Sequence, residues 1–435
     1  MKTTIVALLL SISILSFSQT ELKRKASLGF SLQKMADLPG GIVSNIAAGS
    51  PAQKSGLQNG DRILSFGGVT LTDENVMLKA MRKARGGEIV KLTVLRKGLA
   101  KPTAISFVPL TVPFESHNNL LLETPVVTND YGDNLRAFVT KPKQASGKLP
   151  AILFVSWLSC STVELNDFSD GWVLMLRDVA EKSGCLMLRI EKPGVSDSDG
   201  PPCSDCDLTT ELNGYQAALR YLKSRPDVDT TKIILMGGSL GGTLTSIVGK
   251  GHNIKAYVSA VSVYKTWLEH MIELERRRLQ LSGKNEAEAS QLMQGYFEFH
   301  TDYLAQQKTP AQVLQQKPHL ASLWYDEPAH QYGRPAAFYH QVQRLNFMES
   351  WGNVNVPVLL VAGEHDWIMS LDDNRLLNDM LNKKKPGTCT LMVANGMNHH
   401  WMKFKSAQDA FDEVNGNYDN ATVAKMIEWI KEVVK

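Results

Sequence analysis

Residues 233–242 read Ile-Ile-Leu-Met-Gly-Gly-Ser-Leu-Gly-Gly, and this stretch decides the fold of the chain. The apolar run is typical of a buried parallel strand, and the small residues after it suit a helix. Gly-X-Ser-X-Gly at such a strand-to-helix turn raises the serine Oγ above the sheet. Gly237 and Gly241 fit because strand and helix approach too closely there for side chains. The stretch therefore predicts a nucleophile at Ser239, and a glycine-rich turn capped by that serine is the alternative.

The start of the chain is typical of a signal peptide over residues 1–18. Lys2 supplies a positive charge, residues 5–17 include an apolar segment too short to span a bilayer, and Ser-Phe-Ser at 16–18 suits cleavage. Cleavage there leaves Gln19 first, so we expect a periplasmic or secreted protein. We expect no membrane span, because no later apolar run is long enough. The net charge of +3 comes without a dominant basic block, so no nucleic-acid partner is expected.

A first domain is expected over residues 20–111. An amphipathic helix is predicted over about 73–84, and the β-branched residues 89–95 predict a strand. Ahead of them stand short segments in a specific order: Ser-Leu-Gly-Phe at 27–30, Ser-Pro-Ala at 50–52, Gly-Leu at 56–57 and Gly-Asp at 60–61. This succession closely resembles a PDZ domain of the bacterial type, a small and mainly β fold.

That resemblance implies a site for the end of a peptide. The backbone N–H groups around Leu28, Gly29 and Phe30 would capture a chain-terminal carboxylate, and the next strand would offer a free edge to an extended peptide. Leu28 and Phe30 would line the pocket for the last side chain of that peptide. The alternative is a PDZ fold that only packs against the rest of the protein.

Residues 112–435 alternate between apolar strand patterns and amphipathic helix patterns. Such alternation implies a parallel sheet covered on both faces, with ligands beyond the carboxyl ends of the strands, where Ser239 lies. The alternation stops from about 264 to 354, where a helical lid is expected. Arg276-Arg277-Arg278 in this insertion could meet an anionic substrate or form a solvated helix face. The segments outside the insertion are predicted strands at 120–127, 135–140, 152–155, 185–190, 255–261, 356–361 and 390–393, and helices at 172–182, 211–224 and 421–434.

An acid and a base follow Ser239 along the chain. Residues 361–366, Val-Ala-Gly-Glu-His-Asp, end a late strand, and Gly-Glu-X-Asp resembles the acid loop of the α/β-hydrolase superfamily. The order Ser, Asp, His of that superfamily makes Asp366 the expected acid, with Glu364 as the fallback. His365 is expected to be only a neighbour, because the base should come later in the chain.

The base follows the last predicted strand, in Gly-Met-Asn-His-His-Trp at 396–401. Gly-X-Asn-His resembles the histidine loop of the same superfamily, which favours His399 over His400. A metal site made by His365, Asp366, His399 and His400 is a further alternative. The triad already explains why these residues converge, so we expect no metal and no cofactor.

The resemblance to α/β-hydrolases also implies an oxyanion hole. One N–H would come from Leu240, after the nucleophile, and another from the loop after the early strand. In that loop Ser156-Trp157 stands in place of the usual His-Gly, so Leu158 is the expected second donor and Trp157 the alternative.

Five cysteines leave at least one unpaired. Cys185 and Cys389 begin predicted buried strands and are interpreted as core residues. An exported protein permits disulfides, and we expect a bridge from Cys160 to Cys203 or Cys206. The bridge to Cys203 would tie the predicted oxyanion loop to a neighbouring glycine-rich loop.

Together these patterns resemble a secreted α/β-hydrolase with a helical lid and an N-terminal PDZ domain. The resemblance implies hydrolysis of an ester or an amide through an acyl-enzyme on Ser239, and we favour an ester. Its substrate would be a small-molecule ester or a peptide. A serine peptidase related to aminopeptidases is the alternative, and a binding protein centred on the PDZ domain is a further one.

Overall fold

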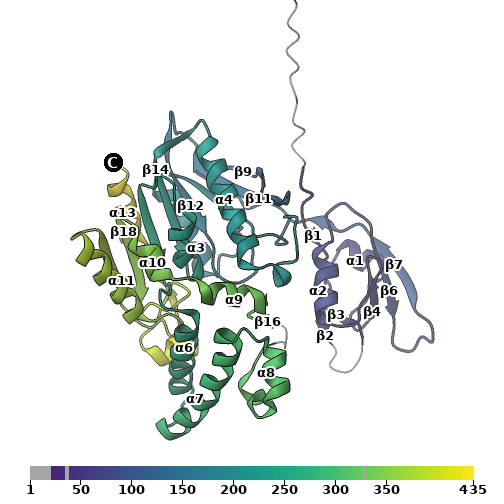
Figure 1. Ribbon diagram of the computed structural model, residues 1–435. Coiled ribbons are helices and arrows are strands. Elements are labelled where there is room, and N and C mark those ends of the chain that lie inside the picture. The colour runs from purple at the N-terminus through teal and green to yellow at the C-terminus, as the bar shows by residue number, and fades with distance from the viewer. Residues whose placement is uncertain (1–20, 35–38, 327–329) are drawn as a thin grey trace, which may run out of the picture.

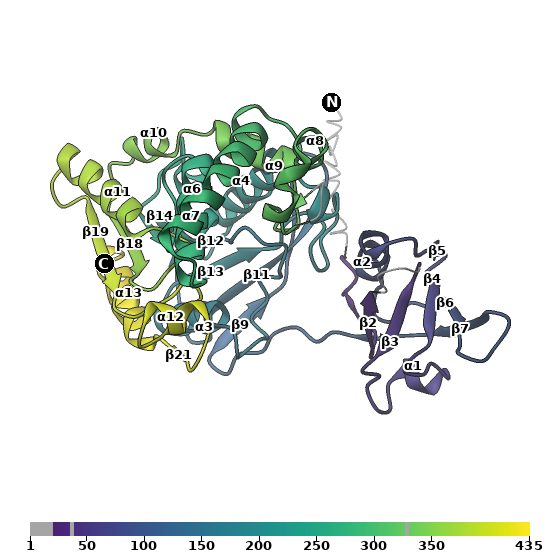
Figure 2. The same ribbon diagram turned by 90° about the horizontal axis from the view of Figure 1, so that it is seen from below.

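A computed structural model describes residues 21–34, 39–326 and 330–435 (Figure 1). The predicted signal peptide, residues 1–18, lies outside the described residues. Figure 2 shows a small unit and a large unit side by side, joined by an extended segment. The last strand of the small unit ends at Thr111 and the first strand of the large unit begins at Leu120. In this described part of the chain, no helix is both long enough and apolar enough to cross a bilayer.

The small unit is a sheet with the strand order β2-β3-β4-β6-β7, in which β5 pairs with β4. Its two helices begin at side-chain caps: Ser50 accepts the N–H of Gln53, and Asp73 accepts the N–H of Val76. Within the described residues β2 lies at one edge of this sheet. The elements are β1 (Ala26–Ser27), β2 (Ser31–Lys34), β3 (Gly41–Ser44), α1 (Pro51–Lys54), β4 (Arg62–Phe66), β5 (Val69–Thr70), α2 (Glu74–Arg82), β6 (Val90–Leu95), β7 (Thr103–Phe107) and β8 (Leu110–Thr111), which pairs with β1.

In the large unit, nine strands of the described chain form one sheet with the order β10-β11-β13-β12-β14-β15-β18-β19, and β9 also pairs with β11. The strands from β13 to β19 are parallel, and β11 runs antiparallel to β13. The strands are β9 (Leu120–Glu123), β10 (Val126–Thr128), β11 (Asn134–Pro142), β12 (Leu149–Val155), β13 (Leu186–Ile190), β14 (Val228–Gly238), β15 (Ala256–Ala260), β18 (Val358–Gly363) and β19 (Cys389–Ala394).

One predicted strand differs in the structure. Residues 120–127, expected to be continuous, are split into β9 and β10 around Pro125. Proline has no N–H to donate to a neighbouring strand, so the ladder is interrupted there. Both pieces nevertheless pair with β11.

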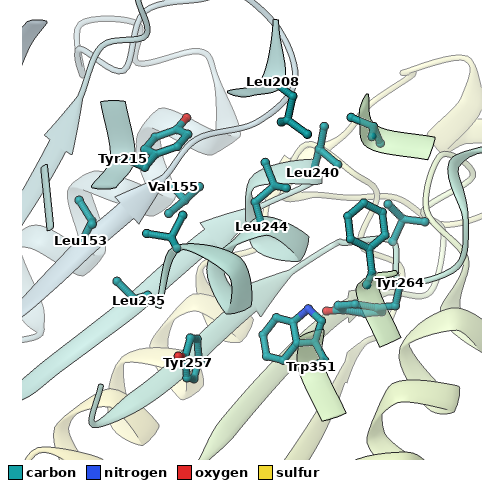
Figure 3. Close-up of a cluster of buried hydrophobic side chains, with 14 of the residues drawn as sticks. Leu153, Val155, Leu208, Tyr215, Leu235, Leu240, Leu244, Tyr257, Tyr264 and Trp351 are labelled. Carbon is teal, nitrogen blue, oxygen red and sulfur yellow. The ribbon is translucent and has the colours of Figure 1, made fainter. Parts of the chain in front are cut away.

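Helices cover both faces of this sheet because successive residues of its strands point to opposite sides. In β12, Leu153 and Val155 belong to one hydrophobic cluster, and Ile152 and Phe154 belong to the other. Figure 3 shows part of the first cluster, with α5 packed on β14 and β15. The first face carries α4 (Leu208–Ser224), α5 (Leu240–Val248) and α11 (Leu371–Lys384), and the second carries α3 (Gly171–Lys182) and α13 (Asn420–Val433).

The expected helical insertion lies between β15 and β18, and its helices over residues 267–344 gather at one end of the large sheet (Figure 1). A capping box starts each of the two long helices: Thr266 with Glu269, and Asn285 with Glu288. The second of these helices ends as an α-helix at His300, and the chain continues as a π-helical turn over Thr301–Ala305. The insertion contains α6 (Trp267–Leu281), α7 (Glu286–His300), α8 (Pro310–Gln316), β16 (His330–Gln331), β17 (Arg334–Pro335), α9 (Ala336–Arg344) and α10 (Phe347–Gly352).

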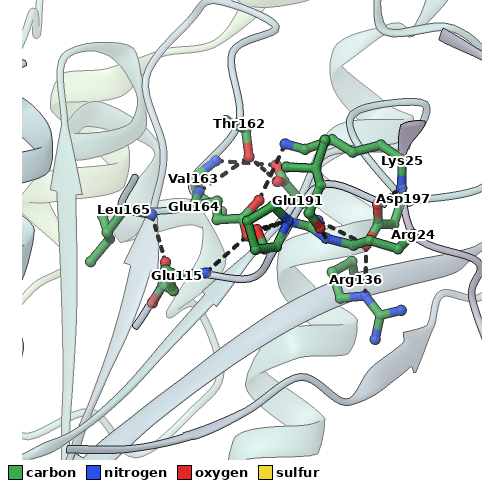
Figure 4. A network of polar contacts seen from close by, with 12 residues as sticks. Arg24, Lys25, Glu115, Arg136, Thr162, Val163, Glu164, Leu165, Glu191 and Asp197 are labelled. Carbon is green, nitrogen blue, oxygen red and sulfur yellow. Dashed lines mark hydrogen bonds and ion pairs between the residues drawn. The ribbon is translucent and has the colours of Figure 1, made fainter. Parts of the chain in front are cut away.

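A buried ionic network attaches the small unit to the large one (Figure 4). Arg24 pairs with Glu164 and, at 3.0 Å, with Asp197. Lys25 adds an ion pair with Glu164 at 3.2 Å, and Arg136 of β11 reaches Asp197 at 3.3 Å. Both carboxylates are almost fully buried, so their charges depend on these cations. The two domains therefore share a charge-compensated junction.

Candidate active site

The turn from β14 to α5 holds Ser239 in a conformation that few residues adopt. Its φ of 56° and ψ of −134° lie outside the common regions of the backbone map. A Cβ on Gly237 would lie 2.6 Å from the backbone of Gly241, and a Cβ on Gly241 would lie 2.1 Å from the carbonyl oxygen of Ser156. These contacts are with backbone atoms that cannot move aside. The turn therefore requires the glycines that the sequence provides.

A chain of hydrogen bonds links Ser239 to the two residues that the sequence singled out. His399 Nε2 lies 3.2 Å from Ser239 Oγ, and His399 Nδ1 lies 3.0 Å from Asp366 Oδ2. The other oxygen of Asp366 accepts the backbone N–H groups of Ile368 and Met369, at 2.9 and 2.8 Å. Each member of the chain is at most 8% exposed. A serine, an imidazole and a carboxylate are thus aligned and largely shielded from water.

The alternative acid and base occupy other positions. Glu364 accepts the backbone N–H of Gly396, and His400 donates its backbone N–H to Asn398. The imidazole of His400 lines the cavity at the site, and burial lowers its pKa. Among the described residues, no group of three or more histidine, cysteine and carboxylate side chains is arranged to hold a metal ion.

The loop beside Ser239 that follows β12 is covalently joined to a second loop. A disulfide connects Cys160, in the loop after β12, to Cys203, in the loop after β13. Cys206, the other partner considered from sequence, keeps a buried free thiol. Leu158 in the first loop lines the cavity together with Ser239 and Leu240, the first residue of α5. The two backbone donors expected from sequence therefore border the same space as the serine.

The cavity above Ser239 has a volume of about 490 Å³ and an apolar, aromatic wall. It lies between the sheet and the helical insertion. Burial lowers the pKa of the lining His270 to about 3, so this imidazole is neutral at pH 7. Asp170 and Arg278 are the acidic and basic side chains of the wall. Its aromatic residues are Trp157, Trp172, Trp267, Tyr325, Tyr332 and Trp367.

Two residues of the site carry roles that sequence reasoning missed. Arg277 of α6 donates to the carbonyl oxygens of Trp367 and Ile368, at 2.8 and 2.9 Å, and so binds the loop that contains Asp366. The run of three arginines at 276–278 was the sequence signal for this role, although Arg277 neither lines the cavity nor forms part of a solvated helix face. Trp172 of α3 packs edge-on against His399, with ring centroids 6.0 Å apart. No sequence pattern marks that contact.

The small unit has its own cavity of about 370 Å³, at its border with the large unit. Leu28 lines it, together with Leu78 and Met81 of α2, and Cys160 lines it from the opposite side. Phe30, expected beside Leu28, lies instead in the core of the small unit, 6.2 Å from the ring of Phe107. An aromatic side chain of that size is more stable inside the small core than at its edge.

Gly29 lies between Leu28 and Phe30 and has a φ of +76°. A Cβ there would lie 2.7 Å from the Cβ of Ser50. The tight turn before β2 therefore requires a glycine at this position.

Comparison with known proteins gives two family matches. A PDZ domain model matches residues 26–106, and the X-Pro dipeptidyl-peptidase (S15 family) model matches residues 131–402. A curated relative, the alpha/beta hydrolase domain-containing protein WAV2 of Arabidopsis thaliana, is 31% identical over 93 residues, which are 21% of this chain. The chain spans about 28% of the length of that relative.

Solved structures with similar folds include three chains of low identity. Est1E from Butyrivibrio proteoclasticus, solved with ferulic acid bound, is 18% identical with a TM-score of 0.46, over 71% of this chain and 96% of that one. An esterase of Pyrococcus furiosus is 12% identical with a TM-score of 0.45, over 74% and 97%. DcsB, solved in complex with its substrate analogue, is 18% identical with a TM-score of 0.46, over 72% and 99%.

The S15 match covers more than half of the chain and includes the serine, the acid and the histidine. The mixed sheet with its covering helices is an α/β-hydrolase fold, and the small unit ahead of it is a PDZ domain. The chain therefore belongs to the X-Pro dipeptidyl-peptidase (S15) family of α/β-hydrolases, and it carries an N-terminal PDZ domain.

Proposed function

We propose that this protein is a serine hydrolase that cleaves an ester with an apolar acyl group. The observation that carries the proposal is the hydrogen-bonded chain from Ser239 through His399 to Asp366. Serine is a weak nucleophile by itself, and an adjacent imidazole oriented by a carboxylate activates it. The order of these residues along the chain also matches that of α/β-hydrolases.

In the proposed reaction, Ser239 Oγ attacks the carbonyl carbon while His399 Nε2 takes its proton. The C–O bond to the leaving alcohol then breaks, and His399 returns the proton to that oxygen. A water molecule attacks the acyl-enzyme in the same way, which releases the acid and restores the Ser239 hydroxyl. Asp366 keeps the Nδ1–H tautomer of His399 and stabilises the imidazolium formed in each half-reaction. The N–H groups of Leu240 and Leu158 are the proposed donors to the oxyanion.

The wall of the cavity supports an ester with an apolar or aromatic acyl group. Its aromatic side chains would bury such a group and would offer a peptide few hydrogen bonds. The Arg278 guanidinium is already engaged, because Nε donates to Glu275 at 2.7 Å and Nη2 donates to the Tyr296 hydroxyl at 2.5 Å. We therefore propose a neutral acyl group.

A second candidate function is peptidase activity, favoured by the family match. Release of a dipeptide requires a negative partner for the free amino terminus. Asp170 is the carboxylate on the cavity wall, and its Oδ1 already accepts the N–H groups of Trp172 and Val173, at 2.7 and 3.4 Å. We place the ester first because the rest of the described wall is largely apolar and aromatic.

The test is labelling with a fluorophosphonate probe, followed by a substrate panel. Wild-type protein should be labelled and Ser239→Ala should not. His399→Gln and His400→Gln form a matched pair, and only the first should abolish labelling. Hydrolysis of p-nitrophenyl esters of aromatic or aliphatic acids would support the esterase. Release of p-nitroaniline from aminoacyl-prolyl p-nitroanilides, without ester hydrolysis, would replace the esterase with the peptidase. Wild-type protein that folds but is not labelled would overturn the catalytic proposal and favour the PDZ-centred binding protein.

For the PDZ domain we propose a ligand with a free peptide carboxylate. The cavity beside Leu28 is lined by two cations, Lys25 and Arg82, and by apolar side chains of α2. A peptide could add to the edge strand β2 with its last side chain in that cavity. Fluorescence polarisation should show binding of peptides with a free carboxyl end, weaker binding of their amides, and loss of binding in Leu28→Asp. Equal binding of acid and amide would exclude the proposal.

We also propose that the protein is exported. The Cys160–Cys203 disulfide supports this, because such bonds persist in oxidising compartments. Amino-terminal sequencing of protein recovered from the expressing cells should begin at Gln19. An intact Met1 on cytoplasmic protein would contradict the proposal.

A further inference from the structure

A buried lysine lies behind the loop that follows β12. Lys192, two residues past the end of β13, is only 3% exposed. Its Nζ donates to three successive backbone carbonyls: those of Trp157, Leu158 at 3.1 Å and Ser159 at 2.9 Å. An ammonium has three N–H donors, so these three contacts use all of them.

The direction of those carbonyls sets the direction of the amides that follow them. In a trans peptide the C=O and the next N–H point in opposite directions. Because the carbonyl of Trp157 faces Lys192, the N–H of Leu158 faces away from Lys192. Within the described residues no acceptor takes that N–H, and Leu158 lines the cavity with Ser239. The donor is thereby left free for a ligand.

The rest of the loop is held by groups on the same side. The hydroxyl of Tyr215 accepts the N–H of Ser156 at 3.2 Å and hydrogen-bonds its Oγ at 2.7 Å. The disulfide to Cys203 holds Cys160 at the other end. Between these two attachments, Lys192 is the group that hydrogen-bonds the carbonyls of residues 157–159.

The charge of Lys192 is balanced without help from the cavity. Glu211 Oε1 lies 3.4 Å from Lys192 Nζ, and the other oxygen of Glu211 pairs with Arg334. Glu211 is thus neutralised twice. Removal of the lysine would take away the donors to the loop and one of the two cations beside Glu211, and it would leave the Glu211–Arg334 pair in place.

We propose that Lys192 is a positioning residue that orients the Leu158 N–H for the oxyanion of the tetrahedral intermediate. This inference rests on the proposed serine-hydrolase function. It makes the ammonium a support for the oxyanion hole rather than a contact of the substrate. Without it, the three peptide planes can rotate, and the donor is no longer preorganised where negative charge develops.

The test compares Lys192→Met, Lys192→Gln and wild type on the best ester of the panel. Loss of one oxyanion donor in other hydrolases lowers kcat by about 10²–10³, so Lys192→Met should lower kcat about 100-fold. KM should change by less than about threefold, because the planar ester gains little from the oxyanion hole. Lys192→Gln retains two donors, and its kcat should lie between the other two.

A second readout separates positioning from general damage. A boronic acid forms a tetrahedral adduct on Ser239, whereas the carboxylic acid product binds without one. Lys192→Met should weaken binding of the boronic acid by about the same factor as it lowers kcat, and it should leave the affinity for the product within about threefold of the wild-type value. Lys141→Met is the matched control, because Lys141 also pairs with carboxylates, Glu123 and Asp227, but on β11 away from the cavity. It should leave kcat and boronate binding unchanged.

Three results would decide the matter. Unchanged kcat and boronate affinity in Lys192→Met, with Ser239→Ala inactive, would overturn the role of Lys192 and leave the serine-hydrolase function standing. Hydrolysis by Ser239→Ala would overturn the function itself. If Lys192→Met does not fold, wild-type kcat and boronate affinity in a folded Lys192→Gln would also overturn the proposal.

Discussion

Replacement of Asp366 by asparagine tests the site most directly, because each oxygen of this carboxylate has a separate partner. Oδ1 accepts two backbone N–H groups of its own loop, and Oδ2 faces His399 Nδ1. Asparagine has the same shape and can keep its oxygen on the loop. Its amide group then faces the histidine and donates a hydrogen bond instead of accepting one.

The expected loss follows from the tautomer. With a donor opposite Nδ1, His399 carries its proton on Nε2, which faces Ser239 and can no longer accept the serine proton. A reversed tautomer of this kind costs about 10⁴ in kcat, or ~5.5 kcal/mol of transition-state stabilisation. The loop keeps both of its hydrogen bonds, so the free energy of unfolding should fall by less than ~2 kcal/mol.

The assay is ester hydrolysis alongside urea denaturation, with Glu364→Gln as the matched control. Glu364 lies two residues away and accepts only the N–H of Gly396 in the hydrogen bonds described, so its variant should retain the activity of the wild type. The reasoning would be refuted by Asp366→Asn protein that keeps more than about a tenth of the wild-type kcat. It would equally be refuted by an inactive Glu364→Gln protein of normal stability.

Three further predictions concern the surroundings of the site. In Gly238→Ala the new Cβ would lie 2.3 Å from the Trp172 ring, so the ring must shift against His399. We expect urea denaturation to show ~1–3 kcal/mol of destabilisation, and kcat to fall at least about tenfold. Gly352→Ala is the control: its new Cβ would lie 3.9 Å from the nearest side chain, that of Met380, and its kcat should match that of the wild type. Reduction of the Cys160–Cys203 disulfide, which spans 43 residues, should lower the free energy of unfolding by ~2–4 kcal/mol, and an unchanged melting temperature in dithiothreitol would contradict this. Burial raises the pKa of Asp373 from 3.8 to about 6, so between these values the folded state holds a proton on Asp373 that the unfolded state has released. The contribution of Asp373 to the free energy of unfolding should therefore fall by up to ~3 kcal/mol as the pH rises from about 4 to 6, and a difference between wild type and Asp373→Asn that stays constant over this range in urea denaturation would contradict this.

Much of the site is a local property of the sequence. The strand-to-helix turn at Ser239 follows from glycines at 237 and 241, since close backbone contacts leave no other residue room. The acid and the histidine each follow an apolar strand, and parallel strands end at the same edge of a sheet. Ser239, Asp366 and His399, far apart in sequence, could therefore be chosen without coordinates.

Other features depend on contacts that no local pattern encodes. Glu364 and Asp366, like His399 and His400, are near neighbours in sequence. The family resemblance favours one residue of each pair, but the path of each loop is what brings His399 to Ser239 and Asp366 to His399. Phe30 was expected at the PDZ cavity because of its place in the turn, but packing against Phe107 puts it in the core. The split of the predicted strand at Pro125 has a local cause, the missing N–H of proline. The pairing of both pieces with β11, by contrast, depends on tertiary structure.

The sequence alone determined the two domain types, the strand-to-helix turn that carries Ser239, and the family resemblance of the acid and histidine loops, because each rests on short stretches with strong backbone or hydrophobic requirements. The tertiary structure alone decided the contacts of the charged side chains. Lys192 beneath residues 157–159, Arg277 on the acid loop and Arg24 at the domain junction all bind groups distant in sequence. A long, flexible cation can reach many partners, and only the packed fold selects one of them.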